Sequence, residues 1–217
     1  MPEIIEIFPN IYKIGPFLAT KNLSPRKRVY GERLFQINNI EYRQWDIYKS
    51  KLAGAIRKGL KEMPIKPGGL VLYLGAATGT TPSHVSDIVG KEGAVFAVEF
   101  AQRSMRDLVK VCESRPNLFP IFADARKPQE YAEYLQGEKV DVLYQDVAQP
   151  EQAQILIKNA EKYLKKGGHA LFAIKSQSID VTQKPKKTYI EVVNQLENAK
   201  FKTIQTILLD PFDKDHM

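Results

Sequence analysis

From residue 70 onward, short runs of consecutive apolar residues alternate with segments in which apolar residues recur every three or four positions. Uninterrupted apolar runs are typical of parallel strands covered on both faces, and the wider spacing is typical of amphipathic helices. The apolar runs predict strands at 70–74, 94–98, 118–122, 140–144 and 169–174, and a last strand is expected at 201–209. Strands that alternate with helices predict an α/β fold with a doubly wound parallel sheet, whose ligands bind at the carboxyl ends of the strands.

The first third of the chain has a different pattern. Short β-like pieces at 4–8, 12–18 and 33–37 are separated by Pro, Gly and Asn. A helical pattern follows and stops before Pro64, with one apolar face formed by Trp45, Tyr48, Leu52, Ile56 and Leu60. We therefore expect a small N-terminal β-rich domain over residues 1–50 and an α/β domain over residues 51–217.

Several helices of the second domain carry start or stop signals. Thr81 before Pro82 is a candidate N-cap, and Gly90 can end the helix that follows. A second helix is expected to open at 150–151 and to close at 165–167, where two lysines precede a glycine. A third helix is expected after Pro185.

Composition narrows the class of protein. The chain has 217 residues, of which 43% are hydrophobic and 26% charged, as in ordinary globular domains. Cys112 is the one cysteine and the three histidines are far apart in sequence, so we expect no disulfide and no metal site. The N-terminal residues lack the basic and apolar stretches of a signal peptide, and no apolar run approaches about 20 residues, so we expect a soluble intracellular protein. The net charge of +7 suggests contact with a polyanion.

A loop of small residues follows the first strand of the second domain, in the sequence LGAATGTTP. Gly75 and Ala76 would let a ligand approach the backbone, and the next helix would present free N–H groups. The spacing matches neither the Walker lysine pattern nor G-x-G-x-x-G. The loop alone therefore leaves open a ligand-binding loop or a tight strand-to-helix turn.

Two acids follow the next two strands. Glu99 ends the second strand, where a carboxylate can hold ribose hydroxyls, and Asp124 follows the third, where it could accept a hydrogen bond from an adenine amino group. Either acid taken singly could be a helix cap or a solvated loop residue. Together with the small-residue loop, they favour a nucleoside-type cofactor.

Asp146 and Lys175 follow the fourth and fifth strands, beside the expected crevice of the sheet. A lysine next to a carboxylate can handle protons, because its pKa falls readily on burial. A plain surface ion pair is the alternative.

Longer stretches of the chain resemble the fibrillarin family in its shorter archaeal form. They are VLYLGAATGTTPSHVSDIV, AVEF, ADAR, VDVLYQDVAQPEQA and AIKSQSID. The resemblance implies a Rossmann-like methyltransferase fold and an S-adenosylmethionine-dependent RNA 2′-O-methyltransferase that acts on rRNA and tRNA. The Gly/Arg-rich arm of eukaryotic members is missing, because the whole chain has only 13 glycines, so a cytoplasmic archaeal-type protein is expected.

The family's site residues carry over onto matching positions. The resemblance implies a catalytic set of Lys51, Asp146 and Lys175, while a fourth residue, a Glu in some relatives, has no clear counterpart. Together with the small-residue loop, the implied cofactor contacts are Gly75, Ala76, Thr80, Thr81, Glu99, Phe100, Asp124, Ala125, Asp146, Val147, Ala148 and Gln149.

The resemblance also implies partners, because the chain has no base-reading module of its own. A box C/D guide RNA would select the target, and a Nop-type scaffold and a kink-turn-binding protein would hold the enzyme. Two other functions remain open on the residues alone. One is a non-catalytic RNA-binding subunit that uses the basic segments at 21–33 and 184–187. The other is an adenine dinucleotide oxidoreductase, but the G-x-G-x-x-G motif of that class is missing. Family members usually continue past the DKDH-like motif with an apolar strand, so we expect an exposed sheet edge in this chain.

Overall fold

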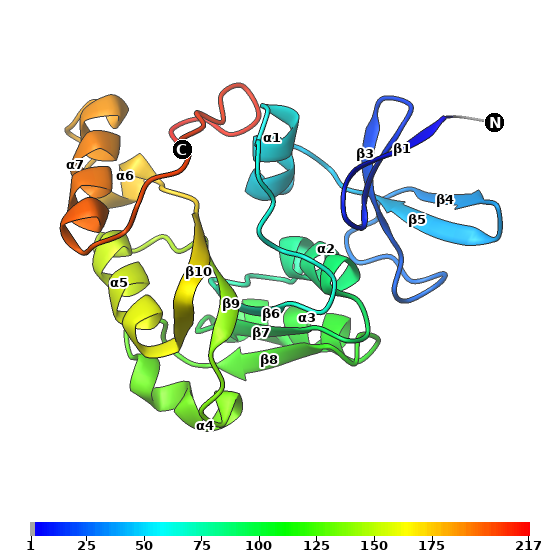
Figure 1. Cartoon of the computed structure of the whole chain (residues 1–217), viewed down its shortest axis with the longest axis horizontal. Coiled ribbons are helices and arrows are strands. Elements are labelled where there is room, and N and C mark those ends of the chain that lie inside the picture. Colours follow the sequence, from blue (N-terminus) through cyan, green and yellow to red (C-terminus); the bar gives the residue numbers. More distant parts are fainter. Residues whose placement is uncertain (1–2) are drawn as a thin grey trace.

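The computed structural model describes residues 3–217 and contains two separate β-sheets (Figure 1). The N-terminal sheet is antiparallel, with the strand order β1-β2-β3-β5-β4. Its strands are β1 (Ile4–Phe8), β2 (Ile11–Ile14), β3 (Phe17–Lys21), β4 (Leu34–Ile37) and β5 (Ile40–Gln44). Asn38 and Asn39 connect the last two strands with positive φ angles of 50° and 62°, which asparagine tolerates in tight hairpin turns. These strands form the β-rich N-terminal part expected from the sequence.

The second sheet is wholly parallel and has the strand order β10-β9-β6-β7-β8. Its strands are β6 (Leu70–Leu74), β7 (Ala94–Glu99), β8 (Leu118–Phe122), β9 (Val140–Gln145) and β10 (Leu164–Phe172). The chain builds outward from β6 to β8 and then crosses to the other side of β6, so the order reverses between β6 and β9. Ligands of such sheets bind at this reversal, outside the carboxyl ends of the strands.

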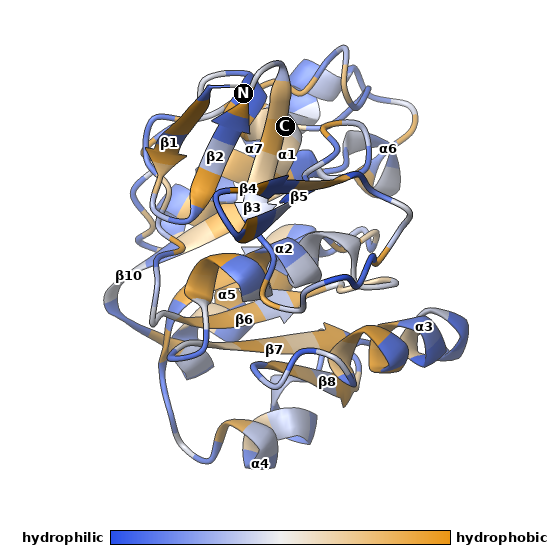
Figure 2. Ribbon diagram, turned by 90° about the vertical axis from the view of Figure 1, so that its right-hand side faces the viewer, coloured by the Kyte–Doolittle hydropathy of each residue, from blue (hydrophilic) through white to orange (hydrophobic). Residues whose placement is uncertain are grey.

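Helices cover both faces of the parallel sheet. Val71, Tyr73 and Tyr144 pack with α1 (Lys51–Arg57), α2 (Thr80–Val89) and α3 (Gln102–Cys112). Leu72 and Leu143 point to the opposite face and pack with η1 (Pro128–Tyr131), α4 (Ala132–Leu135) and α5 (Gln152–Tyr163). Because helices cover both faces, the central strands are apolar at most positions, as the orange β6 and β7 in Figure 2 show. The expected doubly wound α/β fold is confirmed.

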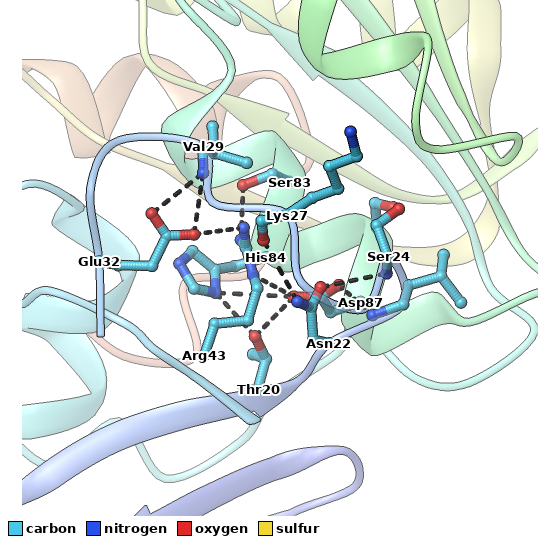
Figure 3. Close-up of polar contacts among 12 residues, drawn as sticks. Thr20, Asn22, Ser24, Lys27, Val29, Glu32, Arg43, Ser83, His84 and Asp87 are labelled. Carbon is cyan, nitrogen blue, oxygen red and sulfur yellow. Dashed lines mark hydrogen bonds and ion pairs between the residues drawn. The ribbon is translucent and has the colours of Figure 1, made fainter. Parts of the chain in front are cut away.

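A buried polar network joins the N-terminal sheet to α2 (Figure 3). The Arg43 guanidinium on β5 donates to Asp87 Oδ2 at 2.8 Å and to Glu32 Oε1 at 2.7 Å, and Arg115 donates to Asp87 Oδ1 at 2.6 Å. All four side chains are fully buried, and two positive charges face two negative ones. Burial raises the pKa of Asp87, but the two guanidinium groups outweigh it and hold that pKa below its usual value. The network fixes the N-terminal sheet on the helix that follows the small-residue loop.

Three helix boundaries differ from the expectation. The helical pattern from Trp45 forms a helix only at Lys51–Arg57, because Asp46 accepts the Tyr48 backbone N–H and turns the chain before α1. The N-cap of α2 is Gly79, with φ +91°, and not Thr81, whose hydroxyl instead donates to Ser50. The helix α5 ends at Tyr163, so the expected closing residues 165–167 lie in β10, which already pairs with β9 at Leu164.

The strand expected at 201–209 is wrong. This segment lacks a hydrogen-bonded strand partner among the residues that the structure describes, and β10 is the edge of its sheet. The Gln205 side chain ties the segment to Gly59 and Lys61 instead. A groove lies between the segment 201–209 and β10, and residues of both elements line it.

Two further helices, α6 (Ser176–Ile179) and α7 (Pro185–Asn198), follow β10, and α7 begins at the expected proline. The C-terminal segment then returns beside α1 (Figure 1), where Lys58 Nζ donates to the Asp210 carbonyl at 2.8 Å. Within residues 3–217, every helix is too short or too polar to cross a membrane.

Candidate functional site

The predicted site residues gather at the carboxyl edge of the parallel sheet. Gly75 follows β6, Glu99 ends β7, Asp124 comes two residues after β8, and Asp146 follows β9. Lys175 comes three residues after β10. Parallel strands place their carboxyl ends at one edge, which is why residues up to 100 positions apart in sequence share this region.

The loop after β6 depends on Gly75. Its φ is +81°, and a Cβ at this position would lie 2.2 Å from the Asp146 carbonyl oxygen. The Asp146 backbone N–H in turn donates to the Leu74 carbonyl at 2.9 Å. The two strand ends that flank the reversal of the sheet are therefore in backbone contact, which only glycine permits.

Glu99 links this loop to the turn after β7. Its Oε2 accepts the Ala77 N–H at 2.8 Å and its Oε1 accepts the Ala101 N–H at 2.7 Å, and only 7% of the residue is exposed. Each carboxylate oxygen can accept a second hydrogen bond, so the group remains able to hold hydroxyls. Phe100, the next residue, is 55% exposed at the rim.

Asp124 has a partner that the sequence did not predict. Arg126 donates to both of its carboxylate oxygens, from Nε to Oδ1 at 3.1 Å and from Nη2 to Oδ2 at 2.6 Å. These hydrogen bonds, opposed by partial burial, hold the pKa of Asp124 below its usual value. The carboxylate is thus kept charged and oriented, with acceptor capacity left for an amino group.

The remaining predicted cofactor residues line the same edge. Ala125 and Val147 are buried, Ala148 is exposed, and Thr80 begins α2, where its carbonyl accepts the Ser83 hydroxyl at 2.8 Å. The buried Oε1 atom of Gln149 has no hydrogen-bond partner within the described chain. A glycine cradle, two oriented carboxylates and an unsatisfied amide oxygen fit a nucleoside-type cofactor.

Lys51 and Asp146 meet across the edge of the sheet. Lys51 Nζ on α1 lies 2.9 Å from Asp146 Oδ2, and about a quarter of each side chain is exposed. A second carboxylate, Asp213 in the C-terminal segment, lies 3.7 Å from the same Nζ. These groups line a cavity of about 150 Å³ that also includes Tyr48 and Phe212. The structure therefore brings together two of the three predicted catalytic residues.

Ser50 places Lys51 at the start of its helix. Its hydroxyl oxygen accepts the Ala53 N–H at 3.3 Å as the N-cap of α1, and it accepts the Thr81 hydroxyl at 2.9 Å. The helix that carries Lys51 is thereby joined to the first turn of α2. This contact spans 31 residues and leaves no local signal in the sequence.

Lys175 makes a different set of contacts. Its backbone is clamped by the Gln152 side chain, which accepts from Lys175 N and donates to Lys175 O, both at 3.0 Å. Within residues 3–217, the Lys175 ammonium makes no ion pair with Asp146. Lys175 forms an antiparallel bridge with His216, whose Nδ1 lies 2.8 Å from Asp213. The catalytic role of Lys175 stays a prediction, and Asp213, His216 and Gln152 are neighbours that sequence reasoning missed.

Comparisons with known proteins agree with this geometry. The Fibrillarin family model matches residues 4–217. A fibrillarin-like rRNA/tRNA 2′-O-methyltransferase of Methanococcus voltae is 51% identical over 222 residues, covering 100% of this chain and 96% of that relative. A protein of the same name from Sulfurisphaera tokodaii is 57% identical over 199 residues, covering 92% of this chain and 84% of the relative.

Solved structures are similar over the whole chain. The fibrillarin pre-rRNA processing protein of Methanococcus jannaschii is 52% identical with a TM-score of 0.95, covering 100% of this chain and 95% of that one. Fibrillarin of Aeropyrum pernix, with natively bound S-adenosyl-L-methionine, is 47% identical with a TM-score of 0.88. The match covers 100% of this chain and 97% of that chain. A fibrillarin/Nop5p complex contains a chain that is 38% identical with a TM-score of 0.88. The match covers 98% of this chain and 96% of that chain.

Proposed function

The chain belongs to the fibrillarin family, and we propose that it is the catalytic subunit of a box C/D guide RNA ribonucleoprotein. It is an S-adenosylmethionine-dependent methyltransferase that acts on ribose 2′-hydroxyls of rRNA and tRNA. One observation carries the assignment of the reaction centre. The Lys51–Asp146 pair lies at the reversal of the sheet, directly beside the Gly75 loop.

The chemical difficulty is the weak nucleophilicity of a ribose hydroxyl. S-adenosylmethionine supplies, when bound, a methyl group on a sulfonium centre. Asp146 accepts a hydrogen bond from the 2′-hydroxyl, orients it, and takes its proton as the oxygen forms its bond to the methyl carbon. The bond from that carbon to the sulfonium sulfur would break at the same time, and a neutral thioether would leave. Lys51, at 2.9 Å, holds the carboxylate in place and offers positive charge near the developing negative oxygen.

The cofactor is held by residues that surround the small-residue loop. Glu99 accepts hydrogen bonds from ribose hydroxyls, and Asp124, oriented by Arg126, accepts one from the adenine amino group. Phe100 offers an exposed ring next to Glu99. Gly75 keeps the floor of the site free of side chains.

RNA selection is assigned to partners. The complex of a related fibrillarin with Nop5p supports a Nop-type scaffold for this chain. We further propose a guide RNA, which chooses the nucleotide by base pairing, and a kink-turn-binding subunit. The basic segment that starts at the end of β3 and leads to β4 supplies non-specific phosphate contacts through exposed Lys21, Arg26, Lys27 and Arg28. Such contacts give dissociation constants of about 10⁻⁴–10⁻⁶ M at physiological salt, which is too weak to select one ribose.

The test compares the free chain with the assembled particle. Methyl transfer is measured on a guide-complementary RNA and on a scrambled RNA, with and without scaffold, kink-turn protein and guide. We expect efficient transfer only to the matched RNA in the complete particle, because assembly raises the local concentration of the target ribose. Efficient, site-specific transfer by the free chain would contradict the proposal.

A further inference from the structure

A buried glutamine at the start of α5 holds the backbone of Lys175 and has no role in the mechanism described above. Gln152 is the first residue of α5 and is fully buried. Its Oε1 accepts the Lys175 N–H and its Nε2 donates to the Lys175 carbonyl, both at 3.0 Å. Burying a polar group costs free energy unless it is hydrogen-bonded, so these two bonds account for a glutamine at a buried position.

The Gln152 amide takes the place of a neighbouring strand. Two directly opposite residues of an antiparallel sheet can exchange both of their N–H···O bonds, and the Gln152 amide makes the same pair of bonds to Lys175. The chain is still extended at Lys175, with φ −100° and ψ 99°, although β10 ends at Phe172. Ile174 exchanges backbone hydrogen bonds with Met217, at 2.8 and 3.1 Å. The chain beyond β10 is therefore held by both Gln152 and the C-terminal segment.

Gln152 is also connected to the strand that leads to Asp146. The side chain of Gln145, the fully buried last residue of β9, donates from Nε2 to the Gln152 carbonyl at 2.7 Å. Gln145 pairs in register with Phe172 of β10, so Asp146 and Lys175 follow one and three residues beyond that pair. Neighbouring strands lie about 4.8 Å apart and rise about 3.3 Å per residue. The flexible four-carbon stem of Lys175 can span a gap of this size once its backbone is fixed.

We propose that Gln152 is the positioning residue that places Lys175 at the reaction centre. This inference rests on the proposed function and on the catalytic role predicted for Lys175. Lys175 then offers its positive charge to the developing negative oxygen from the β10 side, whereas Lys51 holds Asp146 from the α1 side. A displacement of about 1 Å near the reacting atoms can reduce the rate about 10²-fold, so the backbone contact matters for the reaction.

The experiment is a double-mutant cycle in the reconstituted particle. Gln152→Met keeps the approximate size of the side chain and removes both hydrogen bonds, and Lys175→Met removes the ammonium. Gln154→Met is the matched control on the same helix, because the Gln154 side chain is exposed and donates to Gln195 at 3.0 Å. Single-turnover methyl transfer is measured at saturating S-adenosylmethionine and guide-matched RNA, and the affinities for both are determined separately. If Gln152→Met does not fold, Gln152→Glu, which keeps the acceptor for the Lys175 N–H, takes its place in the cycle.

Gln152→Met is expected to lower the single-turnover rate about ten- to 100-fold and to leave both affinities within about threefold of the Gln154→Met values. In the Lys175→Met background, the same substitution should cause no further loss, because residues that act as a unit are not additive. Losses that multiply in the double variant would overturn the inference, as would a Gln152→Met rate within about threefold of the control or an unchanged rate in Lys175→Met. These results require an active wild-type particle. A wild-type particle that transfers no methyl group would overturn the proposed function, and this inference with it.

Discussion

Replacing Gly75 by alanine tests the backbone contact on which the site is built. A Cβ at this position would lie 2.2 Å from the Asp146 carbonyl oxygen, 2.9 Å from its carbon and 3.2 Å from Val147 Cγ1. Since ordinary contacts of this kind begin at 3.4 Å, the chain at Asp146 must retreat by about 1 Å. A displacement of about 1 Å at a reacting group can reduce the rate about 10²-fold. We therefore expect Gly75→Ala to lower kcat/KM about 100-fold and to weaken cofactor binding.

The control separates the clash from backbone strain. Gly137 has nearly the same backbone angle, with φ +82° against +81°, but nothing lies within 4 Å of its Cβ position. Both substitutions force alanine into the left-handed region, at a cost of roughly 1–2 kcal/mol, and both should lower the Tm. Methyl transfer by the reconstituted particle and calorimetry with S-adenosylmethionine are then compared. Activity of Gly75→Ala within threefold of Gly137→Ala would refute the reasoning.

Three further predictions concern stability, positioning and cofactor binding. Burial, together with the charges of Arg43 and Arg115, holds the pKa of His84 well below its usual value, so the unfolded chain binds a proton that the folded chain does not. The free energy of unfolding should therefore be independent of His84 titration above about pH 6.5 and should fall by up to about 1.4 kcal/mol per pH unit below it. His84→Gln should flatten this slope in urea titrations at pH 5–7.5, and equal slopes in the two proteins would contradict the prediction. Ser50→Ala should lower kcat roughly fivefold, because it removes an N-cap of about 1 kcal/mol that positions Lys51, while Ser50→Thr keeps most activity. An unchanged kcat in Ser50→Ala would reject this role. Glu99→Ala should weaken S-adenosylmethionine binding by about 1.5–3 kcal/mol in calorimetry, and an unaltered affinity would remove Glu99 from the cofactor site.

The parallel sheet could be predicted from the sequence because its strands are buried on both faces. Runs such as 70–74 and 118–122 are apolar throughout, and the structure gives both strands the same bounds. The segment 201–209 mixes apolar residues with Lys202, Thr203, Gln205 and Thr206, and it remains unpaired in the described chain. Apolar composition favours an extended chain, whereas a strand also needs a neighbour at hydrogen-bonding distance, which local sequence does not encode.

The site was predictable where it follows strand ends and hidden where it depends on distant contacts. Glu99 and Asp146 could be placed by counting strands. The Lys51–Asp146 pair joins residues 95 positions apart, and only the family resemblance indicated it. Asp213 reaches Lys51 through the C-terminal segment, which no periodicity connects to α1.

The Lys51–Asp146 centre is tested most directly by Asp146→Asn, which keeps the shape of the side chain and removes its charge and basicity. Single-turnover methyl transfer is measured in the reconstituted particle at saturating S-adenosylmethionine and guide-matched RNA, with affinity for both determined separately. The account predicts a rate about 10²–10⁴-fold below wild type, the usual contribution of a positioned acid–base group. A rate within tenfold of wild type at saturation would contradict the assignment of Asp146 as the group that activates the ribose hydroxyl.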